Sequence, residues 1–298
     1  MALGPLAPID RATLAYVAVA LAFNLVRGPH SRPALPLLCL GLLLLAVVAA
    51  VVAPRARRAG PLGRILAEFY PLLLTVSLYT HVGLVNSAGG VSHDALVQQW
   101  EQALFGGQPA LEWIRAFPSP AWSTLMHAAY LSYYLILAGA PLGLWAQGRR
   151  EAARGTILLM MATFYVCWVT FLSFPVAGPR YQFAPADNAA TAVPVAVLTR
   201  RLLEARSAWG TAFPSSHVAV ALVAAGCAWR GSRPLGLVLV PAAVLMSLAT
   251  VYGQLHYAVD ALAGAGLASV ALIANRRAGY DSGFAVPDHH LAPHGDHR

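Results

Sequence analysis

The chain has 298 residues, of which 58% are hydrophobic and only 11% are charged, and its mean hydropathy is +0.61. This composition excludes an ordinary soluble globular domain and indicates a polytopic membrane protein. The formal net charge is +8, but its arginines occur in short clusters between apolar runs, which is typical of loops at a membrane face and argues against a nucleic-acid partner.

A helix that spans a bilayer needs about 20 mainly apolar residues. Eight segments meet this requirement: 9–26, 34–53, 65–85, 122–147, 155–175, 213–230, 234–252 and 257–275. The first segment has no basic stretch and no small-residue cleavage site in front of it, so we expect a retained span rather than a signal peptide. The sequence thus predicts an all-α polytopic helix bundle of about eight transmembrane helices, six in the core and two N-terminal.

We expect three parts in the chain. Residues 1–64 form the two N-terminal transmembrane helices, 65–277 form the main membrane domain, and 278–298 form a polar, disordered tail. The tail contains His289, His290, His294 and His297, which we interpret as part of a disordered segment rather than as a metal site. The three cysteines, Cys39, Cys167 and Cys227, lie inside apolar runs and are expected to be buried hydrophobes.

Two connections between the expected spans are long and polar. Residues 92–118 carry Leu96, Trp100, Leu104, Phe105 and Trp113 at partly helical spacing, which predicts short amphipathic helices at the membrane interface. Residues 176–212 form the longest polar connection.

The distribution of arginine predicts the orientation, because short cytoplasmic loops collect positive charge. With the N-terminus in the cytoplasm, 13 arginines fall inside and 7 fall outside. The inner set is Arg11, Arg55, Arg57, Arg58, Arg64, Arg149, Arg150, Arg154, Arg230, Arg233, Arg276, Arg277 and Arg298; the outer set is Arg27, Arg32, Arg115, Arg180, Arg200, Arg201 and Arg206. We therefore expect both termini in the cytoplasm and residues 176–212 on the outer face of a plasma (inner) membrane.

Three titratable side chains interrupt the apolar sequence where two spans begin. His217 stands in FPSSH, and His256 and Asp260 stand in LHYAVD. Two spans separate these stretches, so both reach the same membrane face, where ionisable groups usually line an internal polar site. His256 and Asp260 are four residues apart, on one helix face, so the acid can fix the imidazole tautomer and leave the other nitrogen as a nucleophile. His217 is then available as a general acid or base.

The residues around His217 favour an anion. Ser215 and Ser216 precede a helix N-terminus, where unpaired N–H groups and hydroxyls bind phosphate, and Arg180 in FPVAGPRY carries a guanidinium suited to two phosphate oxygens. Each residue taken singly also fits a structural role, such as a helix cap or a loop charge. Their conjunction on one membrane face favours a phosphate site.

The PSSH and HYxxD motifs resemble the second and third signature motifs of the type-2 phosphatidic acid phosphatase superfamily. That family also includes vanadium haloperoxidases and bacterial lipid phosphatases. The resemblance implies that His256 forms a phosphohistidine, that Asp260 orients it, that His217 is the proton donor, and that Ser215 and Ser216 contact the phosphate. It covers about residues 65–275.

Three departures from the family pattern point to one branch of it. No lysine is present for the first motif, Thr250 stands where the third motif has arginine, and FPVAGPRY replaces the usual Lys-to-Arg-Pro pattern. These features, together with the segment DALVQQWEQALFGGQP, are similar to the inositol phosphorylceramide synthase-like branch, whose members move a phosphorylated head group from one lipid to another.

Three functions stay open at this point. The first is a lipid phosphotransferase of that branch, with a phospholipid donor and a lipid acceptor. The second is a lipid phosphate phosphatase that hydrolyses phosphatidic acid-type or isoprenyl phosphates with water as the acceptor. The third is a non-catalytic membrane scaffold or transporter. We expect no cofactor and no metal for the chemistry, and an active site on the outer face.

Overall fold

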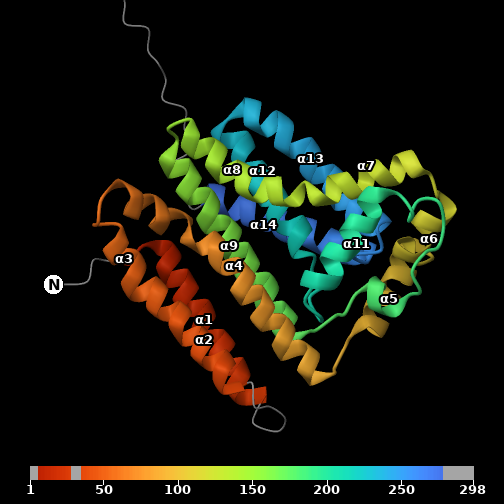
Figure 1. The fold of residues 1–298 in the computed structure, drawn as a ribbon, viewed down its shortest axis with the longest axis horizontal. Helices are drawn as coiled ribbons and strands as arrows, with labels where there is room; N and C mark the ends of the chain where they lie inside the picture. The colour runs from red at the N-terminus through yellow and green to blue at the C-terminus, as the bar shows by residue number, and fades with distance from the viewer. Residues whose placement is uncertain (1–5, 28–34, 278–298) are drawn as a thin grey trace, which may run out of the picture.

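The computed structural model describes residues 6–27 and 35–277, and in these residues the secondary structure is helical, without strands (Figure 1). This confirms the predicted all-α bundle. The elements are α1 (Pro8–Arg27), α2 (Leu35–Val47), a π-helical turn (Val48–Val52), α3 (Ala53–Ala56), α4 (Pro61–Gly89), α5 (Asp94–Phe105), α6 (Pro109–Ala116), α7 (Pro120–Leu131), α8 (Tyr133–Ala146), α9 (Arg150–Ser173), α10 (Pro179–Gln182), α11 (Pro194–Arg206), α12 (Ser216–Gly231), α13 (Arg233–Tyr252) and α14 (Ala258–Arg277). The His-rich tail lies outside the described residues.

Among the described residues, six helical segments are long and apolar enough to cross a membrane: Pro8–Val26, Leu38–Ala56, Pro61–Ser87, Arg150–Ser173, Arg233–Tyr252 and Ala258–Arg277. The expected fourth span is divided into α7 and α8, which are bent by 43°, and the number of spans is seven if this bent pair counts as one. The expected sixth span is α12, whose 16 residues fall just short of the roughly 17 that a straight crossing needs. Helix length and composition therefore support six or seven spans in the described residues, not the eight predicted.

Helix α12 is the centre of the bundle. It packs against α8, α9, α13 and α14, and most of its residues are fully buried. Its sequence, SHVAVALVAAGCAWRG, is rich in alanine and glycine, and small side chains allow helix backbones to approach closely inside a membrane. Cys227 on this helix and Cys167 on α9 are both fully buried, as expected, and Cys39 on α2 is partly buried.

The two N-terminal helices join the same hydrophobic core, because α1 packs against α2 and α9. A buried acid fixes them to α4. The carboxylate of Asp10 accepts two hydrogen bonds from the guanidinium of Arg57, at 2.6 and 2.8 Å, and one from the hydroxyl of Tyr70, at 2.8 Å. Such a bidentate, charge-assisted contact compensates the cost of burying the carboxylate.

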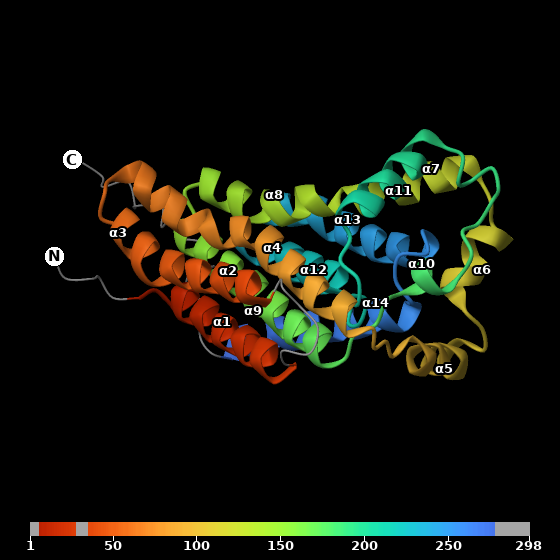
Figure 2. The same ribbon diagram turned by 60° about the horizontal axis from the view of Figure 1, so that its bottom comes forward.

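The two ends of the bundle are formed by different elements (Figure 2). One end holds α3, the start of α4 and the arginine-rich turns, where Arg154 contacts Glu68 and Glu151. The other end holds α5, α6, α10 and α11. Residues 92–118 thus form the predicted short helices, and the polar connection 176–212 contains two further helices that the sequence did not indicate.

A glycine allows the close approach of α14 to α12. A Cβ atom added to Gly264 would lie 2.5 Å from the carbonyl oxygen of Ser215, a backbone atom that cannot turn away, whereas a Cβ on Gly266 would meet nothing within 4 Å. We expect Gly264→Ala to lower the free energy of unfolding by about 1–3 kcal/mol, the usual effect of overpacking. Gly266→Ala, the matched control on the same helix, should leave stability unchanged or raise it slightly. Thermal unfolding in detergent measures both, and equal melting temperatures for the two variants would contradict the packing.

Candidate active site

Three segments far apart in the sequence meet at the end of the bundle that carries α5. The N–H of Ala212 donates to the carbonyl of Val176 at 2.9 Å, and the N–H of Ser215 donates to the carbonyl of Asp260 at 3.0 Å. These two backbone bonds join the segment before Arg180 to FPSSH, and FPSSH to the start of α14. The structure therefore brings together the segments that the sequence placed on one membrane face.

His217 and His256 face one another. The Nε2 atom of His256 lies 3.5 Å from Nδ1 of His217, and the ring centroids are 5.6 Å apart. The imidazole of His217 also packs against the rings of Tyr133 and Tyr130, whose centroids are 4.6 and 5.8 Å away. Two imidazoles this close to one another can act on one reacting group, one as the nucleophile and the other as the proton donor.

Asp260 lies behind His256. Its Oδ2 atom is 3.4 Å from Nδ1 of His256 and also accepts the N–H of Tyr257 at 2.9 Å. A carboxylate in this position favours the tautomer with the proton on Nδ1, which leaves the lone pair on Nε2, the nitrogen that faces His217. The distance is long for a hydrogen bond, as is common for catalytic contacts without a bound substrate.

His256 itself is 5% exposed, and burial lowers its pKa to about 4, although a hydrogen bond with the Ala212 backbone acts in the opposite direction. The side chain is therefore neutral, and so nucleophilic, over the physiological range. Its main chain is held by the end of α13, where the carbonyl of Thr250 accepts the N–H of His256 at 3.0 Å. Gln254 in this turn has a left-handed φ of 58° and accepts the N–H of Ala186 through its side chain.

The two serines have different positions. Ser215 is fully buried and is the N-cap of α12, since its hydroxyl accepts the N–H of Val218 at 3.3 Å. Ser216 lines the same cavity as His217. Ser216 and the α12 N-terminus are thus placed to face a ligand, whereas the side chain of Ser215 has a structural partner.

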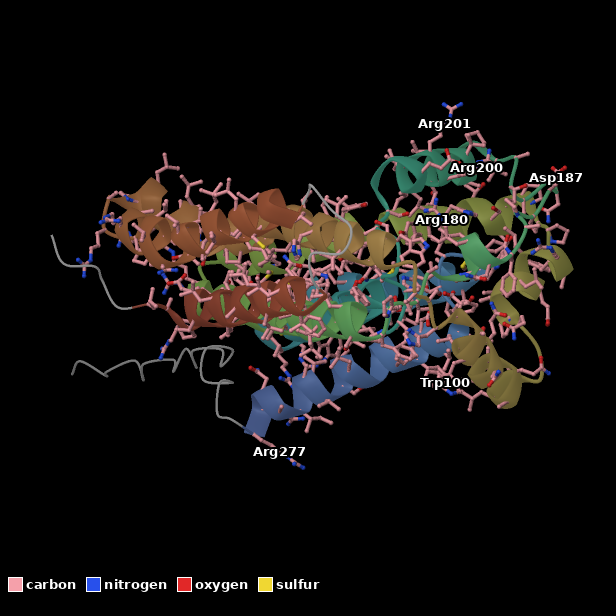
Figure 3. The ribbon with its side chains drawn as sticks, turned by 90° about the horizontal axis from the view of Figure 1, so that it is seen from below. Trp100, Arg180, Asp187, Arg200, Arg201 and Arg277 are labelled. Atoms are coloured by element: carbon pink, nitrogen blue, oxygen red, sulfur yellow. The ribbon has the colours of Figure 1, made fainter. Side chains whose placement is uncertain are left out.

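Arg180 lies on α10, beneath α11 (Figure 3). Its Nη1 donates to the hydroxyl of Ser207 at 2.8 Å, and its guanidinium lies 4.9 Å from the centroid of Tyr181. Ser207 and Tyr181 line the cavity that His217 lines, so Arg180 is placed beside it. No ion pair with a carboxylate is found for Arg180 in the described part of the chain, so its charge is available to a ligand.

Other cations contribute less to the site. Arg200 and Arg201 are exposed on α11, and Arg201 points away from the body of the protein (Figure 3). Thr250, at the place where arginine was expected, is fully buried and its hydroxyl donates to the carbonyl of Ser247 at 2.7 Å. Thr250 therefore has a structural role and adds no charge.

The cavity has a volume of about 780 Å³. It extends from Ser216 and His217 to a mouth between α4 and α8, which both pack on α9. Val76, Leu84 and Tyr134 line this mouth and are exposed, at 62%, 51% and 58%. An opening of this kind on the apolar flank of a membrane bundle is accessible to a molecule dissolved in the bilayer.

Two acidic residues at the site were not identified from the sequence. Asp94 and Glu101 of α5 are buried, at 3% and 0% exposure, and bind the backbone beside Arg180 and Asp260. Their spacing of seven residues on an amphipathic helix is the signal that places both on one face. Within residues 6–27 and 35–277, no cluster of three or more His, Cys, Asp or Glu side chains is arranged to hold a metal ion.

One family model matches the part of the chain that contains these segments. The model of the PAP2 superfamily matches residues 95–274, which is more than half of the chain. This range contains α6 to α13 complete, nearly all of α5 and α14, and both histidines. No curated protein and no solved structure matches the chain. The extent of the family match shows that the chain belongs to the PAP2 superfamily.

Proposed function

We propose that the protein is an integral-membrane lipid phosphotransferase that acts through a phosphohistidine at His256. The observation that carries this proposal is the approach of His256 Nε2 to 3.5 Å from His217 Nδ1, with Asp260 on the far side of the His256 ring. The cavity that ends at His217 and opens between α4 and α8 supports a lipid substrate.

The chemistry has two steps. In the first, Nε2 of His256 attacks the phosphorus of a phospholipid, the P–O bond to the leaving alkoxide breaks, and protonated His217 gives its proton to that alkoxide. In the second, His217 takes a proton from an acceptor hydroxyl, which attacks the phosphorus and breaks the P–N bond. Arg180 and the N-terminus of α12 bind the phosphate oxygens throughout.

The small number of cations favours transfer of a phosphodiester. A phosphodiester carries one negative charge, whereas a phosphomonoester carries close to two near neutral pH. Arg180 forms no ion pair with an acid within the described residues, and Thr250 supplies no charge. The site therefore suits a donor such as a phosphatidyl-inositol-type lipid and an acceptor such as ceramide or diacylglycerol, as in the inositol phosphorylceramide synthase-like branch.

The acceptor can be tested directly. Purified protein is incubated with a panel of phospholipids labelled in the phosphate, with and without ceramide or diacylglycerol. We expect the label to appear in a new lipid only when the acceptor lipid is present. Release of water-soluble phosphate, with preference for phosphatidic acid or an isoprenyl phosphate, would instead establish the hydrolase. The absence of any conversion, in wild type and His256→Ala alike, would leave a scaffold or transporter.

The roles of the two histidines are separable by the leaving group. A p-nitrophenolate leaves without protonation, so it does not need a general acid. We expect His217→Ala to lower the rate of the first step on an alkyl phosphodiester lipid by about 10²–10⁴-fold, the usual contribution of general acid catalysis. The initial burst of p-nitrophenolate from a p-nitrophenyl phosphodiester should stay close to that of wild type, because it precedes the second step, in which His217 is the general base. His256→Ala should lose both activities, because the nucleophile is absent. Equal losses on both substrates for His217→Ala would refute its role as proton donor.

The pKa of His256 predicts the acid side of the pH profile. Because burial lowers this pKa to about 4, the nucleophile stays neutral well below pH 6.5 and is lost only as the pH falls through about 4. We expect kcat/KM to show its acidic decrease near pH 4 to 5. If kcat/KM has already fallen by half at pH 6.5, which is the ordinary pKa of histidine, a buried neutral nucleophile is contradicted.

A further inference from the structure

Helix α5 has its acidic residues on the buried face. Asp94, Val97 and Glu101 are 3%, 0% and 0% exposed, whereas Leu104 and Phe105 are 62% and 44% exposed. This is the reverse of an ordinary amphipathic helix, in which charged residues face water. Burying two carboxylates is costly unless hydrogen bonds compensate it, so their partners indicate what the helix does.

Glu101 binds the start of α14. Its Oε1 accepts the N–H of Ala258 and its Oε2 accepts the N–H of Val259, both at 2.9 Å. These are two of the first N–H groups of the helix, which have no partner inside it. The contact fixes the backbone between His256 and Asp260.

Asp94 binds the segment that leads to Arg180. Its Oδ2 accepts the N–H of Ala177 at 2.7 Å, and its Oδ1 accepts the N–H of Gly178 at 2.8 Å. Gly178 has a positive φ of 98°, a conformation that glycine adopts without strain. The hydroxyl of Tyr257 also donates to Asp94 Oδ1 at 2.9 Å, so one carboxylate joins the Arg180 segment to the residue after His256.

The apolar part of the same face packs on all three site segments. Val97 forms a buried cluster with Val176, Ala212, Tyr257 and Val259. The ring of Trp100 lies 5.9 Å from that of Phe174 and 5.6 Å from that of Phe213, and Figure 3 shows Trp100 beside the start of α14. One short helix thus contacts each segment that carries a site residue.

We propose that α5 holds the three site segments in register, and that Asp94 and Glu101 are positioning residues for Arg180 and for His256 with Asp260. The inference rests on the proposed function, because the effect of positioning is measured on that reaction. Neither carboxylate contacts the reacting atoms. Each uses two oxygens to accept two backbone N–H groups, which the corresponding amide cannot do, since its nitrogen is only a donor.

The two carboxylates predict different kinetic effects. Glu101→Gln loosens the backbone at His256 and Asp260, so we expect kcat to fall about 10- to 100-fold with KM within about threefold, as when a catalytic group is misplaced by about 1 Å. Asp94→Asn loosens the segment before Arg180, so we expect KM to rise about tenfold and binding of orthovanadate, a phosphate analogue, to weaken about tenfold. Glu204→Gln, which removes an exposed carboxylate on α11, is the matched control and should resemble wild type.

Hydrogen exchange provides a readout that does not depend on turnover. Glu101→Gln should accelerate exchange at the amides of Ala258 and Val259 and leave Ala177 and Gly178 as protected as in wild type. Asp94→Asn should accelerate exchange at Ala177 and Gly178 and leave Ala258 and Val259 as protected as in wild type. Unchanged exchange and kinetics in both variants would overturn the inference. So would a parallel loss of kcat, vanadate binding and melting temperature in both, because that pattern is general unfolding.

The outcomes also separate this inference from the proposed function. If wild type binds orthovanadate but converts no lipid of the panel, the proposed function fails. The positioning role is then still tested, because Asp94→Asn should selectively weaken vanadate binding and accelerate exchange at Ala177 and Gly178. If wild type converts a lipid and the two variants match Glu204→Gln in every measurement, the proposed function stands and the positioning role is refuted.

Discussion

Three carboxylates converge at the start of α14, and the geometry of the site depends on this convergence. Asp260 accepts the N–H of Tyr257, Glu101 accepts those of Ala258 and Val259, and Asp94 accepts the hydroxyl of Tyr257. The N-terminus of a helix carries partial positive charge and unpaired N–H groups, so it stabilises buried anions that would otherwise be costly. Because His256 directly precedes this point, the same contacts that stabilise the acids also place the nucleophile.

The arrangement puts an acid behind His256 and leaves little positive charge in front of the two histidines. Asp260 lies on the Nδ1 side of His256, whereas Arg180 lies beside the cavity that ends at His217. An acid behind the ring stabilises the charge that develops on the imidazole during attack on phosphorus. Among the described residues, Arg180 is the arginine beside the cavity without an ion pair, which suits a singly charged phosphodiester, and this links the buried Thr250 to the proposed transfer between lipids.

Most of this site could be predicted from the sequence because its residues interrupt apolar spans. The number of spans between FPSSH and LHYAVD was sufficient to bring His217 and His256 to one face, and the structure places them 3.5 Å apart. The four-residue spacing likewise placed Asp260 beside His256. Which membrane face this is, and the chemical role of each residue, stay predictions.

The parts that could not be predicted depend on tertiary contacts. From the sequence, Asp94 and Glu101 fit the polar face of an interfacial helix. Periodicity shows that the two residues share a face, but it does not show that this face is buried against backbone N–H groups. Ser215 has the capping role that any serine before a helix can have, and sequence alone could not separate it from Ser216. The length of α12 was overestimated because the apolar run begins in the turn at FPSS, before the helix starts at Ser216.

The central claim is that His256 is the nucleophile, and trapping the intermediate tests it most directly. Wild-type protein is mixed with a phospholipid labelled in the phosphate, quenched within milliseconds in alkali, which preserves a phosphorus–nitrogen bond, and analysed by peptide mass spectrometry. The account predicts that the label appears on the peptide containing His256 before product accumulates, and that it is absent in His256→Ala. Label on His217, or product formed at full rate without any labelled protein, would contradict it.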